Sequence, residues 1–115
     1  MPSSRLLLVA PETDLRKSLL FALEAEGFEV TLRDAPPAHG WLARNRFDCT
    51  ILDQKALAGE PYEAIAFCIK AHPVVLLAAR PHPWLLEWVA GSVELPLSGN
   101  DIIAAIRAAA PGDAA

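Results

Sequence analysis

The 115-residue chain alternates short apolar runs with amphipathic stretches from one end to the other. The apolar runs predict strands at residues 6–10, 28–32, 47–53, 74–79 and 93–95. The amphipathic stretches predict helices from a Thr13 or Asp14 cap to Gly27, from Pro36 to Arg46, from Tyr62 to Ala71, from Pro83 to Ala90, and from an Asn100 cap onward. Strict alternation implies parallel strands joined by right-handed crossovers. The sequence therefore predicts an α/β fold, a three-layer, doubly wound, five-stranded parallel sheet.

Two details of these helices can be compared with a structure. The third helix carries Ile65, Ala66 and Ile69, which we expect to face inward. The fourth helix is expected to stop at Gly91, since glycine commonly follows the last turn of a helix.

The charge balance and the cysteines exclude several classes of function. Ten basic and fourteen acidic residues give a formal net charge of -4 without a basic cluster, so no direct nucleic-acid partner is expected. Cys49 and Cys68 stand nineteen positions apart, without a CxxC or a histidine at ligand spacing. They are interpreted as buried, reduced thiols, and no metal site is predicted. The three histidines are scattered singly, which supports no catalytic dyad.

The ends of the sequence bear on localisation and domain organisation. Residues 1–5 lead into an apolar segment of five residues, far shorter than a signal-peptide core or a membrane span, so a cytoplasmic protein without membrane contact is expected. Pro111 and Gly112 follow a helical run and precede small residues. We therefore expect one domain over residues 1–110 and a tail or the start of a linker over residues 111–115.

Function in such a sheet is expected at the carboxyl ends of the strands, where strand order reverses. Ala10, Pro11 and Asp53 belong to that edge. No glycine-rich phosphate loop follows the first strand, which disfavours dinucleotide and nucleoside-triphosphate binding.

The layout resembles the receiver domain of bacterial two-component response regulators. Asp14-Leu15-Arg16 and Glu26-Gly27-Phe28 match the family's first helix, residues 34–38 match its D-G-x-x-A, and residues 47–53 match the strand that ends in its phosphate-accepting aspartate, here Asp53. The resemblance covers nearly the whole chain. It implies a flavodoxin-like sheet with strand order 2-1-3-4-5.

Most residues that make the family's aspartate reactive are replaced. The two positions that would hold Mg²⁺ beside Asp53 read Ala10 and Pro11, and Glu12 matches a position that usually points elsewhere. The hydroxyl position after the fourth strand reads Ala78, and Leu95 stands where a lysine would precede the proline. The resemblance thus implies a pseudo-receiver with a vestigial pocket, no magnesium or other cofactor, and no enzyme activity.

Asp53 itself has two interpretations. It is either a residual phosphate acceptor or a leftover carboxylate exposed at a loop, and we favour the second because one ligand does not make a magnesium site. Lys55, two residues on, could form an ion pair with Asp53 in place of metal or phosphate charge. Arg80, beyond the fourth strand, could reach the same pocket and bind a small anion.

A partner surface is expected around the fourth helix. Trp84 and Trp88 lie one turn apart with Leu85 beside them, and Glu87 is the one charged residue of the segment 81–91. This helix is either tucked deeply into the core or exposes an apolar patch. The resemblance implies docking or homodimerisation through the face of the fourth helix, fifth strand and fifth helix.

Three functions are compatible with these observations. The first is a phosphorylation-independent protein-interaction module in bacterial signalling. The second is a working phosphorelay receiver phosphorylated on Asp53. The third is a sensor that binds a nucleotide second messenger in the remodelled pocket.

Overall fold

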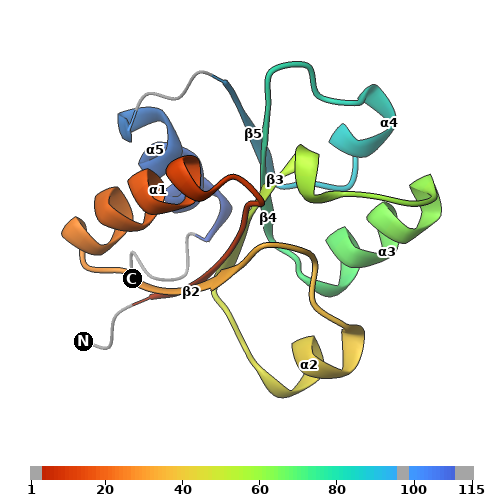
Figure 1. Cartoon of the computed structure of the whole chain (residues 1–115), viewed down its shortest axis with the longest axis horizontal. Helices are drawn as coiled ribbons and strands as arrows, with labels where there is room; N and C mark the ends of the chain where they lie inside the picture. The colour runs from red at the N-terminus through yellow and green to blue at the C-terminus, as the bar shows by residue number, and fades with distance from the viewer. Residues whose placement is uncertain (1–3, 96–98, 111–115) are drawn as a thin grey trace.

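The computed structural model describes residues 4–95 and 99–110 and shows a five-stranded parallel sheet covered by helices on both faces (Figure 1). The strands are β1 (Arg5–Val9), β2 (Glu29–Arg33), β3 (Cys49–Asp53), β4 (Val74–Ala78) and β5 (Gly91–Glu94). The helices are α1 (Thr13–Ala25), α2 (His39–Arg44), the 3-10 turn η1 (Gln54–Ala56), α3 (Pro61–Lys70), α4 (Pro83–Leu86) and α5 (Gly99–Ala109). The strand order is β2-β1-β3-β4-β5, as predicted.

The sheet divides the core into two layers because alternate residues of a strand point to opposite faces. On one face Leu6, Leu8 and Ile51 pack beneath α1 and α5. On the other face Leu7 and Leu52 belong to the layer that is covered by α2, α3 and α4. The three central strands are therefore apolar on both sides, as expected for strands covered on both faces.

Several helix boundaries and faces differ from expectation. The residue before α1 is Glu12, which makes no side-chain capping hydrogen bond among the described residues, so the predicted Thr13 or Asp14 cap is wrong. Helix α5 begins at Gly99, which places Asn100 inside its first turn instead of at its cap. Helix α4 ends at Leu86, and Gly91 opens β5 instead of closing the helix.

The inward face of α3 was also assigned wrongly. Ala64, Phe67 and Cys68 are buried, whereas Ile69 is 57 % exposed. The helix carries apolar side chains on more than one face, and the bulky ring of Phe67 lies against the sheet. This choice leaves Ile69 on the surface.

No helix within the described ranges is long and apolar enough to cross a membrane. Residues 111–115, predicted as a tail or linker, lie outside the described part of the chain.

Candidate functional site

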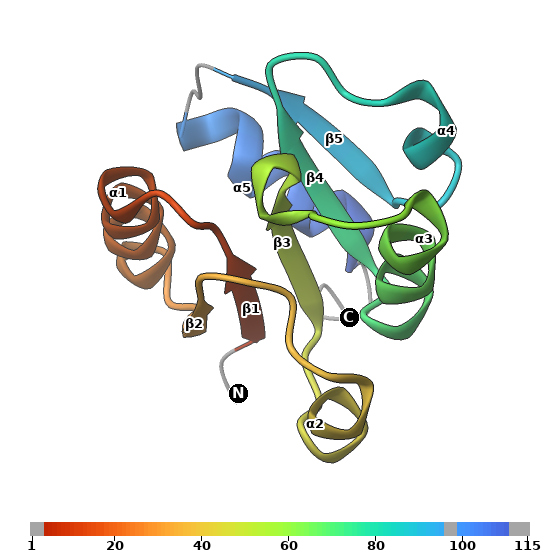
Figure 2. The ribbon, with the colours of Figure 1, turned by 45° about the vertical axis from the view of Figure 1, so that its right-hand side comes forward.

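The candidate site is the edge where the carboxyl ends of the parallel strands meet, next to η1 and the start of α1 (Figure 2). Asp53 is the last residue of β3, in the middle of the sheet. Ala10 follows β1 directly, and Ala78 is the last residue of β4. The sheet thus brings together the predicted acceptor position and two of the positions at which the resemblance implies a replaced residue.

Asp53 is enclosed at this edge, with only 1 % of its surface exposed. Its Oδ1 accepts a hydrogen bond of 3.0 Å from the backbone N–H of Lys55 and so caps η1. Its Oδ2 is buried and has no hydrogen-bond partner among the described residues. The expectation of an exposed carboxylate is wrong, because β1 and β4 flank β3 on both sides and the η1 turn folds back over its end.

The predicted ion pair between Lys55 and Asp53 is also wrong. The Lys55 ammonium lies 3.1 Å from Oε1 of Glu12, in the loop between β1 and α1. Both side chains are more than half exposed. The pair links the two loops beside Asp53, while Lys55 contacts Asp53 through its backbone alone.

Breaking this ion pair should change stability little. We expect Lys55→Ala to lower the free energy of unfolding by less than about 1 kcal/mol, because exposed ion pairs gain little in water. Urea denaturation monitored by tryptophan fluorescence measures it, with Glu12→Gln as the matched variant from the other side of the pair. A loss of several kcal/mol in either variant would show that the pair holds the fold together.

The remaining predicted positions add no side-chain oxygen or nitrogen to this edge. Ala10 is fully buried, and its carbonyl accepts a 2.7 Å hydrogen bond from Nη1 of Arg16. Pro11 is exposed. Ala78 is buried, and Leu95 is half-buried against the core layer under α1 and α5.

The carboxylates present do not fit a magnesium site. Mg²⁺ requires an octahedral set of oxygen ligands, commonly with one or two carboxylates oriented toward it. Within residues 4–95 and 99–110, no group of three or more histidine, cysteine, aspartate or glutamate side chains is placed to hold a metal ion. Glu12 is already paired with Lys55, and the free oxygen of Asp53 is enclosed.

A contact that the sequence did not predict joins two loops of this edge. The amide nitrogen of Gln54 donates to the carbonyl of Arg80 at 3.0 Å, and its Oε1 accepts from the backbone N–H of His82 at 2.9 Å. One side chain therefore fixes the segment between β4 and α4 to η1. The side chain of Arg80 is exposed, and its carbonyl makes this contact.

Comparison with solved structures identifies this architecture. The chain superposes on the receiver domain of a sensor histidine kinase from Pseudomonas aeruginosa, solved with a magnesium ion in its active-site cleft, with a TM-score of 0.79 and 17% identity over 95% of this chain and 98% of that chain. A sensor protein from Polaromonas sp. gives a TM-score of 0.78 and 20% identity over 96% of this chain and 98% of that chain. The chemotaxis protein CheY4 of Vibrio cholerae gives a TM-score of 0.76 and 19% identity over 93% of this chain and 98% of that chain.

The chain has the fold of a response-regulator receiver domain. No family model and no curated protein matches the sequence itself. The predicted resemblance is confirmed at the level of the fold, together with the strand order that it implied. Within this receiver fold, Asp53 occupies the carboxyl end of the central strand β3.

The predicted interface residues of this receiver fold differ in exposure. Trp84 and Trp88 are each 39% exposed, whereas Leu85 is fully buried in the core layer under α2, α3 and α4. Leu85 therefore anchors α4 and is not a contact residue for a partner. Because α4 ends at Leu86, Trp88 lies in the following turn, where its backbone N–H donates a 3.0 Å hydrogen bond to the carbonyl of Leu85.

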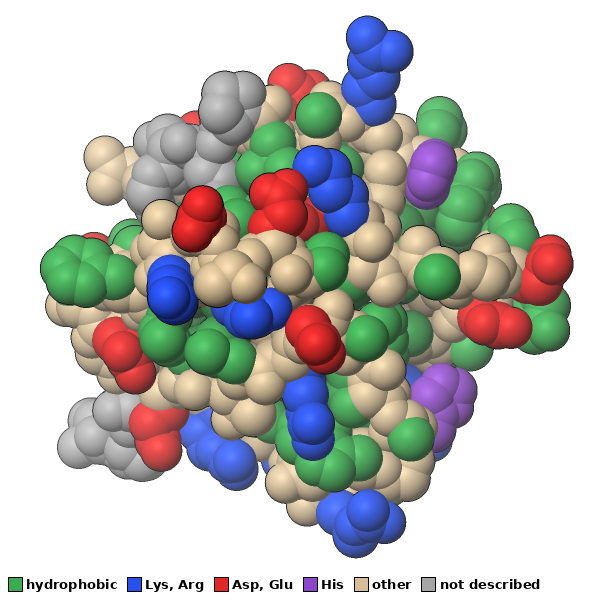
Figure 3. Space-filling model, in the orientation of Figure 1, with side chains coloured by type: hydrophobic (Ala, Val, Ile, Leu, Met, Phe, Trp, Pro, Cys, Tyr) green, Lys and Arg blue, Asp and Glu red, His purple; other side chains and the backbone are tan. Residues whose placement is uncertain are grey.

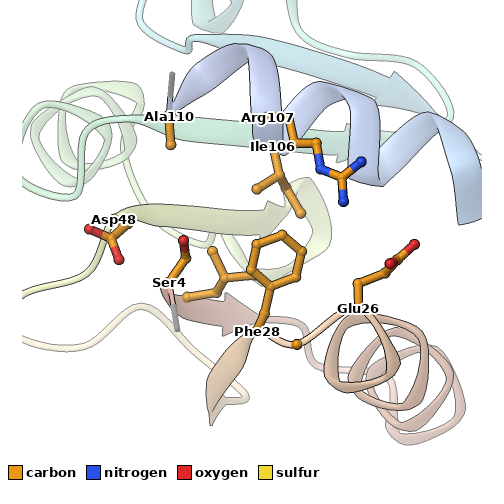
Figure 4. Close-up of a pocket in the computed structure, with 9 residues that line it drawn as sticks. Ser4, Glu26, Phe28, Asp48, Ile106, Arg107 and Ala110 are labelled. Carbon is orange, nitrogen blue, oxygen red and sulfur yellow. The ribbon is translucent and has the colours of Figure 1, made fainter. Parts of the chain in front are cut away.

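A cavity of about 280 Å³ lies at the opposite edge of the sheet, far along the strands from Asp53 (Figure 4). It is bordered by the start of β1, by Phe28, by Asp48 before β3, and by Ile106 of α5. Arg107 and Glu26 face each other at one side of the cavity, and Asp48 lies at the other. The cavity is thus separate from the strand-end site.

The two cysteines of the receiver fold are buried free thiols, as the sequence predicts. Burial raises the pKa of Cys49 from 9.0 to about 12; a hydrogen bond with the backbone of Thr50 lowers that pKa by less, and the charge of Asp48 raises it by less. Burial alone raises the pKa of Cys68 to about 11. Both thiols therefore stay protonated, and unreactive as nucleophiles, at neutral pH.

This predicts a pH dependence of reactivity and of stability. Both thiols should resist a disulfide reagent at pH 8 and react fully in urea.

Because the native pKa values exceed the ordinary value of 9.0, the contribution of the two thiols to the free energy of unfolding is complete below pH 9 and falls as pH rises toward 11 and 12. A variant with both cysteines changed to alanine should lose less stability over that range, and an equal loss would contradict the assignment.

Proposed function

We propose that this chain is a pseudo-receiver, a cytoplasmic protein-interaction module of bacterial two-component-type signalling that works without phosphorylation, metal or catalysis. The observation that carries the proposal is the state of Asp53. Its side chain is enclosed, one oxygen caps η1, and the loops beside it are joined by the Lys55–Glu12 pair. A phosphate donor has no open carboxylate to approach.

The chemistry of phosphoryl transfer supports this proposal. Such transfer depends on positioning and on neutralising the charge of the phosphoryl group. A single unit-charge contact at about 4 Å is worth roughly 4 kcal/mol at an intermediate dielectric, before desolvation is subtracted. By the resemblance, Ala10 and Pro11 stand in place of two metal-binding acids, Leu95 in place of a lysine, and Ala78 in place of a hydroxyl residue. Their combined loss would slow phosphorylation by orders of magnitude.

The loop contacts support the absence of a phosphorylation switch. Ala78 has no hydroxyl that could follow an added phosphoryl group, and Gln54 holds the segment after β4 at two backbone positions. A switch requires an element with two arrangements of similar free energy. The two hydrogen bonds of the Gln54 side chain favour one arrangement of the segment between β4 and α4.

Protein is the favoured class of partner. The net charge is -4, and the face shown in Figure 3 carries both acidic and basic side chains. Nucleic-acid binding depends on a strongly basic field. We therefore infer no direct nucleic-acid partner.

An NMR titration with Mg²⁺ followed by beryllofluoride, a phosphoryl mimic, tests the proposed function. A receiver domain known to bind magnesium serves as the positive control. We expect no saturable shifts centred on the amides of Asp53, Gln54 and Lys55. Saturable shifts at those amides would show a working receiver and overturn the proposal.

A further inference from the structure

A cleft of about 390 Å³ lies between the end of α3 and the turn that follows α4. It is lined by Cys68, Ile69, His72, Glu87, Trp88 and Val89. Cys68 is fully buried and Val89 is half-buried, so they form the base of the cleft, while the exposed side chains of the others form its rim. The cleft is separate from the strand-end edge that contains Asp53.

Large apolar side chains at the rim are exposed to solvent and are not buried in the core. Ile69 is 57% exposed and Trp88 is 39% exposed. Figure 3 shows hydrophobic side chains at the right-hand edge of the molecule, where Figure 1 places α3 and α4. Apolar side chains gathered at a cleft, with an aromatic ring among them, are typical of protein-binding sites.

The charge of the cleft selects the kind of partner. Glu87 is the one carboxylate in the lining, and no lysine or arginine lines it. Within the described ranges, Glu87 forms no ion pair in the chain. A cation that entered the cleft would meet Glu87 and Trp88, which both line it. A carboxylate pairs with cations, and the face of an indole attracts them through its quadrupole.

We propose that this cleft binds a segment of a partner protein in which one lysine or arginine stands between apolar side chains. The proposal rests on the proposed function as an interaction module and names the chemistry of its partner. The basic side chain pairs with Glu87 over the indole of Trp88, and the apolar side chains cover Ile69 and the base of the cleft.

Trp84 provides a matched control for Trp88. Both indoles are 39% exposed, and both belong to the segment around α4. Trp84 does not line the cleft, and its ring stacks on His82 at 5.1 Å between centroids with an angle of 11°. Loss of either side chain removes a similar exposed aromatic surface, so a difference between the two reports on the cleft alone.

Selection of a displayed, fully randomised peptide library against the whole chain, without any phosphate donor, tests the proposal. Enriched peptides should carry a lysine or arginine flanked by apolar residues. Their affinity should fall about tenfold or more with Trp88→Ala and stay within about twofold with Trp84→Ala. Glu87→Lys, an exposed substitution, should abolish the preference for a basic residue. Circular dichroism confirms that each variant is folded.

The outcomes separate this proposal from the proposed function. A library that yields no binder, binders without a basic residue, or equal losses in the two tryptophan variants would overturn the cleft proposal. The pseudo-receiver proposal would stand in each case, because it depends on Asp53. Conversely, phosphorylation of Asp53 alongside Trp88-dependent basic binders would overturn the proposed function and leave the cleft assignment intact.

Discussion

Replacing Ala10 with aspartate is expected to lower the free energy of unfolding by about 3–5 kcal/mol at pH 7, because it buries a carboxylate without a partner. Ala10 is fully buried and belongs to the core layer under α1 and α5. The resemblance to receiver domains places a metal-binding acid at this position. In this chain the core packs around the methyl group of Ala10, so introducing a carboxylate there without a metal ion should destabilise the fold. Urea denaturation in the absence of divalent metal measures the loss.

The neighbouring substitution Pro11→Asp is the matched control. Pro11 is exposed, and a carboxylate there stays in water, so a loss of at most about 1 kcal/mol is expected, mainly from the greater freedom of the unfolded chain without the proline. Equal, small effects for the two variants would mean that water reaches position 10, as it would at an open acidic pocket. That result would contradict the burial of position 10 at the carboxyl ends of the strands.

Truncating Leu85 is expected to lower the free energy of unfolding by about 2–5 kcal/mol in Leu85→Ala, through lost burial and the cavity left behind. Leu85 is fully buried, although the sequence predicted it at an interface. Thermal and urea unfolding both measure the loss.

Leu86 is the matched control, since it is the next residue of α4 and is 40% exposed. Leu86→Ala should cost less than about 1 kcal/mol. A similar cost for the two variants would contradict the orientation of α4. It would also weaken the placement of Trp88 at the rim of the cleft, because Trp88 is held by the carbonyl of Leu85.

The fold could be predicted from the sequence because its strongest signals are local. Short apolar runs separated by amphipathic segments determine the order of strands and helices, and parallel crossovers then restrict the topology. Which face of a helix is buried could be predicted less well than the order of the elements. Helix α3 carries Ile65 and Ile69 as well as Phe67 and Cys68, and only packing against the sheet decides which pair is buried.

The end of α4 was missed for a related reason. The spacing of Trp84 and Trp88 favoured one continuous helix. In the fold, the N–H of Ala90 bonds to the carbonyl of Val74 at 2.8 Å, and Gly91 pairs with Val75 as β5 begins. Pairing with β4 draws this segment out of the helix, and a long-range contact of this kind is invisible in a local pattern.

The place of the site residues along the strands could be predicted from the sequence, but the contacts that their side chains make could not. The sequence placed Asp53 at a strand end, and the resemblance implied which neighbouring positions are replaced. It suggested Lys55 as the partner of Asp53 because they are two residues apart, whereas the ammonium pairs with Glu12, 43 positions away. Burial of Asp53 follows from loops that meet only in the folded chain.

The most direct test of the proposal that Asp53 is not phosphorylated is incubation with acetyl phosphate and Mg²⁺, followed by intact-protein mass spectrometry. A working receiver domain is treated in parallel, and Asp53→Asn identifies any labelling at other positions. The account predicts a phosphoryl adduct on the working receiver and none on this chain. An adduct that forms on the wild-type chain and is absent from Asp53→Asn would contradict it.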